Sequence, residues 1–118
     1  MERLSEIRTA RREHATYAIE QIEQRLAQIP AELDGAYKSE AEHRASVDEA
    51  DNAIKALEIT IRYYTSPYPF EDEVNSAKAH YEHAYRVMEA ARDTARSLTE
   101  EQVRLAEELG VLKRFTHE

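Results

Sequence analysis

The chain has little of what most fold classes and reaction types need. It contains no cysteine, which excludes a disulfide framework, a thiol nucleophile and a thiolate metal site. Its 2 glycines and 3 prolines are too few for the turns of a sheet protein, and they nearly exclude glycine-rich nucleotide-binding loops. No nucleophile-elbow or zinc-protease motif is present. The sequence therefore favours a helical protein without recognisable reaction machinery.

Targeting patterns are missing as well. No apolar run approaches the ~20 residues that a transmembrane helix needs. Residues 1–6 lack the basic-then-apolar order of a signal peptide. We therefore expect the cytoplasm as the location, and we expect no association with a membrane.

What the chain does have is charge and helix-forming residues. Charged side chains make up 34% of its 118 residues, and alanine, glutamate, arginine and leucine dominate. This composition is typical of long helices and coiled coils. The length predicts a single helical-bundle domain over residues 1–118, long enough to bury a core.

The clearest pattern lies in residues 33–64. Apolar and aromatic side chains recur there at alternating spacings of three and four residues, which forms a seam along which a helix packs against other helices. The seam positions are Leu33, Ala36, Glu40, His43, Val47, Ala50, Ile54, Leu57, Ile61 and Tyr64. Only Glu40 and His43 among them are neither apolar nor aromatic. The pattern predicts one long helix over this range.

A first helix is predicted over residues 3–29. Its later half carries a seam of its own that ends at Ile29, directly before Pro30. Proline disfavours helical geometry in the residue before it, so the helix should stop at Ile29. Two interpretations of the break stay open. Either Pro30 sits in the first turn of the next helix with Gly35 inside it, or that helix begins near Asp34, whose side chain can cap it.

The strongest turn signal is the segment 65–70. Pro67 and Pro69 stop the preceding helix and hold an extended corner. Three acidic residues at 71–73 then complement the positive end of a new helix dipole. A regular seam predicts that this helix runs over 71–96 and pairs with the preceding helix as an antiparallel hairpin.

A short last helix is predicted over residues 99–109. Thr99 and Gln102 match a capping box, and Gly110 is typical of a helix stop. We therefore predict an all-α fold, an antiparallel three-helix bundle made of a long helical hairpin and an N-terminal helix, with this short C-terminal fourth helix. Because the seams are narrow and rich in alanine, a homodimer built by pairing hairpins stays open as an alternative.

Charge provides the first candidate for function. The net charge of -8 disfavours direct binding to nucleic acid or to an anionic membrane. Residues 32–51 carry seven acids against Lys38 and Arg44, a local balance of -5. This stretch is either a solvated helix surface or a face that meets a protein with a basic surface, such as a nucleic-acid-binding protein. The predicted partner-binding acids are Asp48, Glu49 and Asp51, and a basic cluster near the N-terminus consists of Arg3, Arg8, Arg11 and Arg12.

The proline corner is the second candidate. It is surrounded by Tyr63, Tyr64, Tyr68 and Phe70. Aromatic side chains on a rigid loop make good interface anchors. Tyr64 lies on the seam and Tyr63 does not, so Tyr63 and Tyr68 are expected outside, with Phe70 as a further partner-binding residue. In the alternative interpretation, the aromatic group plugs the open end of the bundle.

Glu40 and His43 form the one sharp chemical motif. The Glu-x-x-His spacing puts both on one helix face, and ferritin-like di-iron bundles use two such motifs plus a glutamate from each of two further helices. The motif occurs once here, and in the predicted hairpin it lies opposite Ala95 to Leu98. We therefore expect a partly buried polar pair that fixes helix register, without a metal or other cofactor. The alternative is a metal site that Glu40 and His43 form with their own copies across an antiparallel homodimer.

Together these patterns predict a non-enzymatic, acidic protein–protein interaction module, such as a small inhibitor or adaptor that binds a basic target. A metal-binding bundle that uses Glu40 and His43 is the first alternative, and a structural coiled-coil oligomer is the second. Small acidic helical proteins recur among phage and plasmid products that block host machinery, and the chain resembles them in size and charge.

Overall fold

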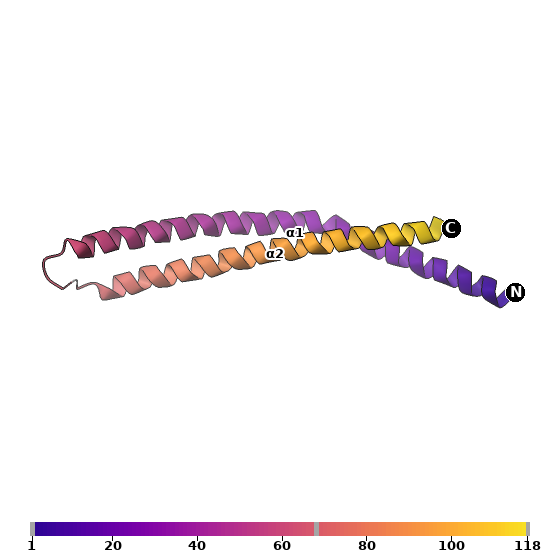
Figure 1. The fold of residues 1–118 in the computed structure, drawn as a ribbon, viewed down its shortest axis with the longest axis horizontal. Coiled ribbons are helices and arrows are strands. Elements are labelled where there is room, and N and C mark those ends of the chain that lie inside the picture. The colour runs from indigo at the N-terminus through magenta and orange to yellow at the C-terminus, as the bar shows by residue number, and fades with distance from the viewer. Residues whose placement is uncertain (1, 68, 118) are drawn as a thin grey trace. The chain divides into compact units, whose positions relative to one another are not determined.

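The computed structural model describes residues 2–67 and 69–117, and of Glu2 it describes the backbone alone. Over these residues it contains two α-helices, α1 (Glu2–Arg62) and α2 (Glu71–His117), of 61 and 47 residues. The segment between them reverses the chain, so α1 and α2 form an antiparallel helical hairpin (Figure 1). The predicted proline corner is therefore the place where the chain turns back.

By its internal contacts the chain divides into two compact units. Unit 1 comprises Met1–Asp34 and Arg96–Glu118, and unit 2 comprises Gly35–Ala95. Each unit takes one segment from α1 and one from α2. The single domain over residues 1–118 stays a prediction.

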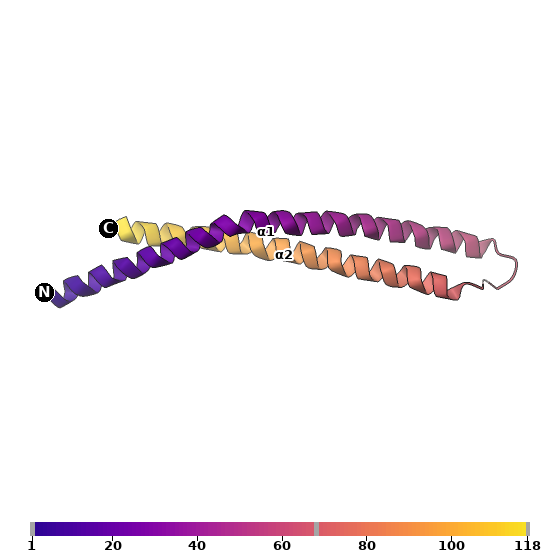
Figure 2. The ribbon, with the colours of Figure 1, turned by 180° about the vertical axis from the view of Figure 1, so that it is seen from behind.

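Unit 2 holds a small apolar core. Val47 of α1 packs against Ala84 and Met88 of α2, and all three side chains are buried. Tyr81 is partly buried against this core, and its ring stacks on that of Tyr85 with the centroids 6.1 Å apart. Both views of the ribbon show the two helical segments of this unit side by side (Figures 1 and 2).

Unit 1 is organised around Ile29. Its side chain is 0% exposed, and it is the largest fully buried side chain among the described residues. Ala15 of α1 and Leu105 of α2 are buried as well. An ion pair links Lys113 Nζ of α2 to Glu23 Oε1 of α1 at 3.9 Å. Apolar contacts and charge pairs thus hold the two helical segments of this unit together.

The predicted three-helix bundle with a fourth helix is wrong. Helix α1 runs without interruption through Pro30 and Gly35, where a break was expected. Helix α2 runs in the same way through Thr99 and Gly110, the predicted cap and stop. No residue in the described part of the chain has a positive φ, so neither glycine ends a helix in the left-handed conformation. The all-α class and the hairpin remain, with two helices in place of four.

The phase of the hydrophobic pattern explains why the local stop signals fail. Ile29 and Leu33 are four residues apart, so the seams of the predicted first and second helices share one three-four register. An unbroken helix keeps both seams on one face. Proline inside a helix costs about 3 kcal/mol, whereas a break would disturb the packing of several seam residues, each of which contributes about 1.5–3 kcal/mol when fully buried. Continued packing therefore outweighs the penalty at Pro30.

Candidate functional site

Large apolar and aromatic side chains lie exposed around the turn in unit 2. Tyr63 is 77% exposed, Phe70 is 56% exposed and Tyr64 is 44% exposed. Ile59 and Ile61, near the end of α1, are 52% and 38% exposed. We call these five residues the tip. They give an otherwise charged chain a surface with the chemistry of an interface.

The tip agrees with only part of the prediction. Tyr63 lies outside, as expected. Tyr64 does not follow the seam to the inside, and Tyr68 lies outside the described residues. Because Tyr63, Tyr64 and Phe70 are all exposed, the interpretation in which they plug an open end is wrong for these three residues. Their role in binding a partner stays a prediction.

The way in which α1 ends explains the exposure of the two tyrosines. The N–H of Tyr63 donates to the carbonyl oxygen of Ile59 at 3.3 Å, as in an α-helix. The N–H of Tyr64 donates to the carbonyl oxygen of Ile61 at 3.2 Å, which is the tighter turn with which many helices finish. Both tyrosines stand past Arg62, the last residue of α1, where the three-four seam no longer sets their direction.

Acidic residues border the tip. Glu71, Asp72 and Glu73 occupy the first turn of α2, where the helix dipole favours negative charge. The N–H of Glu73 donates to the carbonyl oxygen of Phe70 at 3.1 Å, which ties Phe70 to the start of this helix. The tip therefore combines aromatic contact area with a neighbouring negative charge. We call the three acidic residues the collar.

The predicted partner-binding acids of residues 32–51 differ in their surroundings. Asp51 Oδ2 pairs with Lys55 Nζ at 2.8 Å, and the hydrogen bond that Lys55 donates to this carboxylate raises the pKa of Lys55. Asp48 and Glu49 are exposed and form no ion pair with another described residue. These two carboxylates are open to a cation on another protein, whereas Asp51 already has a partner.

Glu40 and His43 are partly buried in unit 2 and are bonded to neighbouring groups. Glu40 Oε1 accepts a hydrogen bond from Arg44 Nη2 at 2.7 Å and another from Arg92 Nε at 3.3 Å. His43 Nδ1 lies 2.7 Å from the carbonyl oxygen of Ser39, one turn earlier in α1. The carboxylate therefore works as a link between α1 and α2.

The helix register differs from the prediction at this point. Glu40 meets Arg92 of α2, one turn before the predicted Ala95 to Leu98. Within the described part of the chain, no group of three or more histidine, cysteine, aspartate or glutamate residues is placed to hold a metal ion. A metal site across a homodimer stays a prediction. To bind a metal there, Glu40 would first have to break its hydrogen bonds with Arg44 and Arg92.

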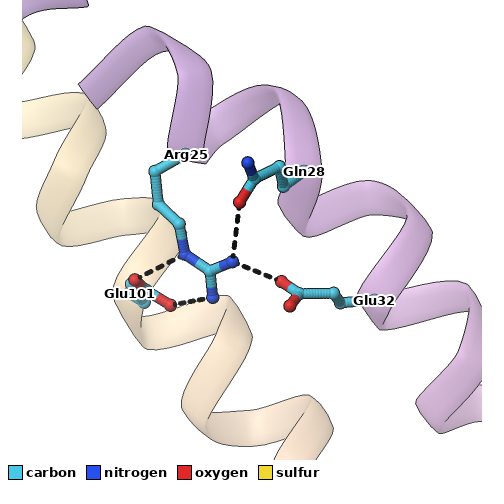
Figure 3. A network of polar contacts seen from close by, with 4 residues as sticks. All are labelled: Arg25, Gln28, Glu32 and Glu101. Carbon is cyan, nitrogen blue, oxygen red and sulfur yellow. Dashed lines mark hydrogen bonds and ion pairs between the residues drawn. The ribbon is translucent and has the colours of Figure 1, made fainter. Parts of the chain in front are cut away.

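A charge network that sequence reasoning missed lies in unit 1 (Figure 3). Arg25 donates from Nε and Nη2 to the two carboxylate oxygens of Glu101, at 2.9 and 2.8 Å. Its Nη1 donates to Glu32 Oε2 at 2.6 Å and to Gln28 Oε1 at 3.4 Å. This two-pronged pairing joins α1 to α2. The signal in the sequence is that Arg25 stands beside the seam residue Leu26, but its partner depends on the register between the helices.

The network shifts the ionisation of both partners. Hydrogen bonds to Glu101 and then to Glu32 raise the pKa of Arg25, and the hydrogen bond from Arg25 lowers the pKa of Glu101. A carboxyl group whose pKa is lowered by folding stabilises the folded state fully above its unfolded pKa of about 4.3. That stabilisation is lost as the pH falls through the lowered folded value.

Glu101→Gln should therefore destabilise the protein near neutral pH and make progressively less difference in acid. The measurement is the free energy of unfolding in urea, for wild type and variant, from neutral pH down to below the lowered pKa. Glu100→Gln is the control, because Glu100 is exposed and has no ion-pair partner among the described residues. A gap between wild type and Glu101→Gln that does not change with pH would show that the pairing with Arg25 contributes nothing.

Neither helix, over the residues that the structure describes, contains a stretch long and apolar enough to cross a membrane. No family model matches the chain, and no curated protein or solved structure matches it. Its own residues therefore carry the functional argument.

Proposed function

We propose that the chain is a helical-hairpin interaction module that binds a protein target through its tip. The 77% exposure of Tyr63 is the observation that carries this proposal. Aromatic side chains offer large contact area at little cost in conformational entropy, and they are frequent among the residues that dominate binding energy. The module acts by occupying a site on its target, as a small cytoplasmic inhibitor or adaptor, and it is not an enzyme.

The target has a basic surface around an apolar pocket. Glu71 and Asp72 of the collar lie next to the tip, and the exposed Asp48 and Glu49 belong to the same unit. The net charge of -8 extends this attraction beyond the contact itself. Electrostatic attraction speeds association and selects basic partners, while burial of aromatic rings slows dissociation.

Paired captures from an extract of the source cell test the proposal. The full chain serves as bait, and mass spectrometry identifies and quantifies the captured protein. The variant Tyr63→Ala with Phe70→Ala should lower capture of that protein about tenfold or more, because it removes two anchors. The control is Tyr17→Ala with Tyr37→Ala, which removes two tyrosines that are 64% and 54% exposed but lie outside the tip. This control should capture as much as wild type.

Charge-reversal variants then test the electrostatic part of the proposal, with the same captured protein as the binding partner. Asp48→Lys with Glu49→Lys should slow association and weaken its dependence on salt. Glu13→Lys with Glu20→Lys makes the same change in net charge at exposed positions of unit 1, and it should have the smaller effect. Equal capture by the tip variant and its tyrosine control, or no selective capture by wild type, would contradict the proposal.

A further inference from the structure

An apolar groove lies between α1 and α2 within unit 1. It has a volume of about 550 Å³, and its lining includes Ala18 and Ile22 of α1 and Val111 of α2. Val111 is 56% exposed. Glu107 also lines the groove, and it forms no ion pair within the described chain. The groove is therefore apolar with an available negative charge.

The first turns of α1 carry the complementary features. Leu4 and Ile7 are 59% and 42% exposed, and their spacing of three residues puts them on one face of the helix. Arg3 and Arg8 stand on either side of them in the sequence, and neither forms an ion pair with a described residue. An exposed apolar pair flanked by available positive charge matches an apolar groove with an available negative charge.

The exposed area supports a second copy of the chain as the occupant. The chain exposes 9098 Å². A compact protein of 13.7 kDa exposes about 6,600 Å², so this chain exposes about 2,500 Å² more. A stable dimer buries about 800 Å² on each partner. Two helices that cover only one face of each other therefore leave ample surface for self-association.

We propose that the groove binds residues 3–8 of a second copy, so that two chains form an antiparallel dimer with two-fold symmetry through unit 1. Leu4 then meets Ile22 of the partner subunit, and Ile7 meets Ala18 of the partner subunit. In an antiparallel pairing, the two residue numbers of every pair add up to the same value. The values for Leu4 with Ile22 and for Ile7 with Ala18 differ by only one. One register thus seats both side chains, and the symmetry repeats the contact in the second groove.

The same register brings opposite charges together. Arg3 lies one residue before Leu4, at the end of the groove where Ile22 and Glu107 of the partner subunit lie. Neither Arg3 nor Glu107 forms an ion pair within its own described chain. The contact between them therefore neutralises two charges without breaking an existing ion pair. The proposed contact uses residues of unit 1 alone, whereas the tip consists of residues of unit 2.

Sedimentation equilibrium across a series of concentrations tests the dimer. Wild type should have twice the mass of the 13.7 kDa chain at high concentration and dissociate on dilution. Ile7→Glu should raise the dissociation constant about tenfold or more, because it places a carboxylate in the apolar groove. Ile59→Glu is the matched control at a 52% exposed isoleucine in unit 2, and it should sediment as wild type does.

A charge exchange tests the register. Arg3→Glu and Glu107→Arg should each weaken the dimer, and the chain with both substitutions should recover it. Leu4→Glu provides a second probe of the groove if circular dichroism shows that Ile7→Glu has lost helix. A monomer at every concentration, equal effects of Ile7→Glu and Ile59→Glu, or no recovery on charge exchange would overturn the proposal. None of these outcomes depends on the binding of a target by the tip.

Discussion

Replacing Ile29 by alanine is expected to lower the free energy of unfolding by about 2–5 kcal/mol. The side chain is 0% exposed, so the substitution removes buried methyl and methylene groups and leaves a cavity in unit 1. Domains of this size unfold with about 5–15 kcal/mol, so this single change removes a large share of the total. Most of the described chain is exposed, and few other side chains can compensate.

Urea unfolding followed by far-ultraviolet circular dichroism measures this effect. Ile59→Ala is the matched control, because Ile59 is 52% exposed and its truncation should change the free energy by only about 0.5 kcal/mol. Equal losses in the two variants would show that unit 1 is not packed around Ile29.

Replacing Pro30 by alanine is expected to stabilise the protein by up to about 3 kcal/mol. Proline has no N–H, so the carbonyl oxygen of Leu26 receives no hydrogen bond from position 30 within α1. Alanine supplies that donor, and because Pro30 is exposed the change sacrifices no buried contact. The gain should be visible as a higher urea midpoint with an unchanged slope of the transition.

Pro67→Ala serves as the control for this effect. Pro67 lies in the turn between α1 and α2, outside both helices. An N–H group at this position would therefore form no helical hydrogen bond. Its replacement should cost about 0.4–1 kcal/mol, because proline restricts the unfolded chain. If Pro30→Ala were neutral or destabilising, the backbone around residue 30 could not be an ordinary helix.

The helical class, the turn near residue 67 and the start of α2 at Glu71 could all be predicted from periodicity and turn chemistry. The number of helices could not be predicted from local signals. Pro30 and Gly110 each favour a helix end by an amount of about 1–3 kcal/mol, whereas the shared seam register favours continuation over many residues. The four-residue spacing between Ile29 and Leu33 is the signal that predicts one continuous helix, and it outweighs the local signal of Pro30.

The candidate site was predictable to a smaller extent. The exposure of Tyr63 follows from its position off the seam, but that of Tyr64 depends on where α1 ends, and helix ends are set within one turn by backbone hydrogen bonds. The pairing of Arg25 with Glu101 depends on the register between two helices, as does that of Glu40 with Arg92. Composition and spacing describe each helix separately, so they do not contain this register.

The two-helix fold requires that α1 run without a break through Pro30, so continuity of α1 through residues 29–35 is the central claim. Backbone resonance assignment of the full chain tests it most directly through the Cα chemical shifts of this segment. We predict helical shifts at every residue from Leu26 to Ala36, with slowly exchanging amides on both sides of Pro30. Coil-like shifts at residues 30–35, with a separate helix on each side, would contradict it.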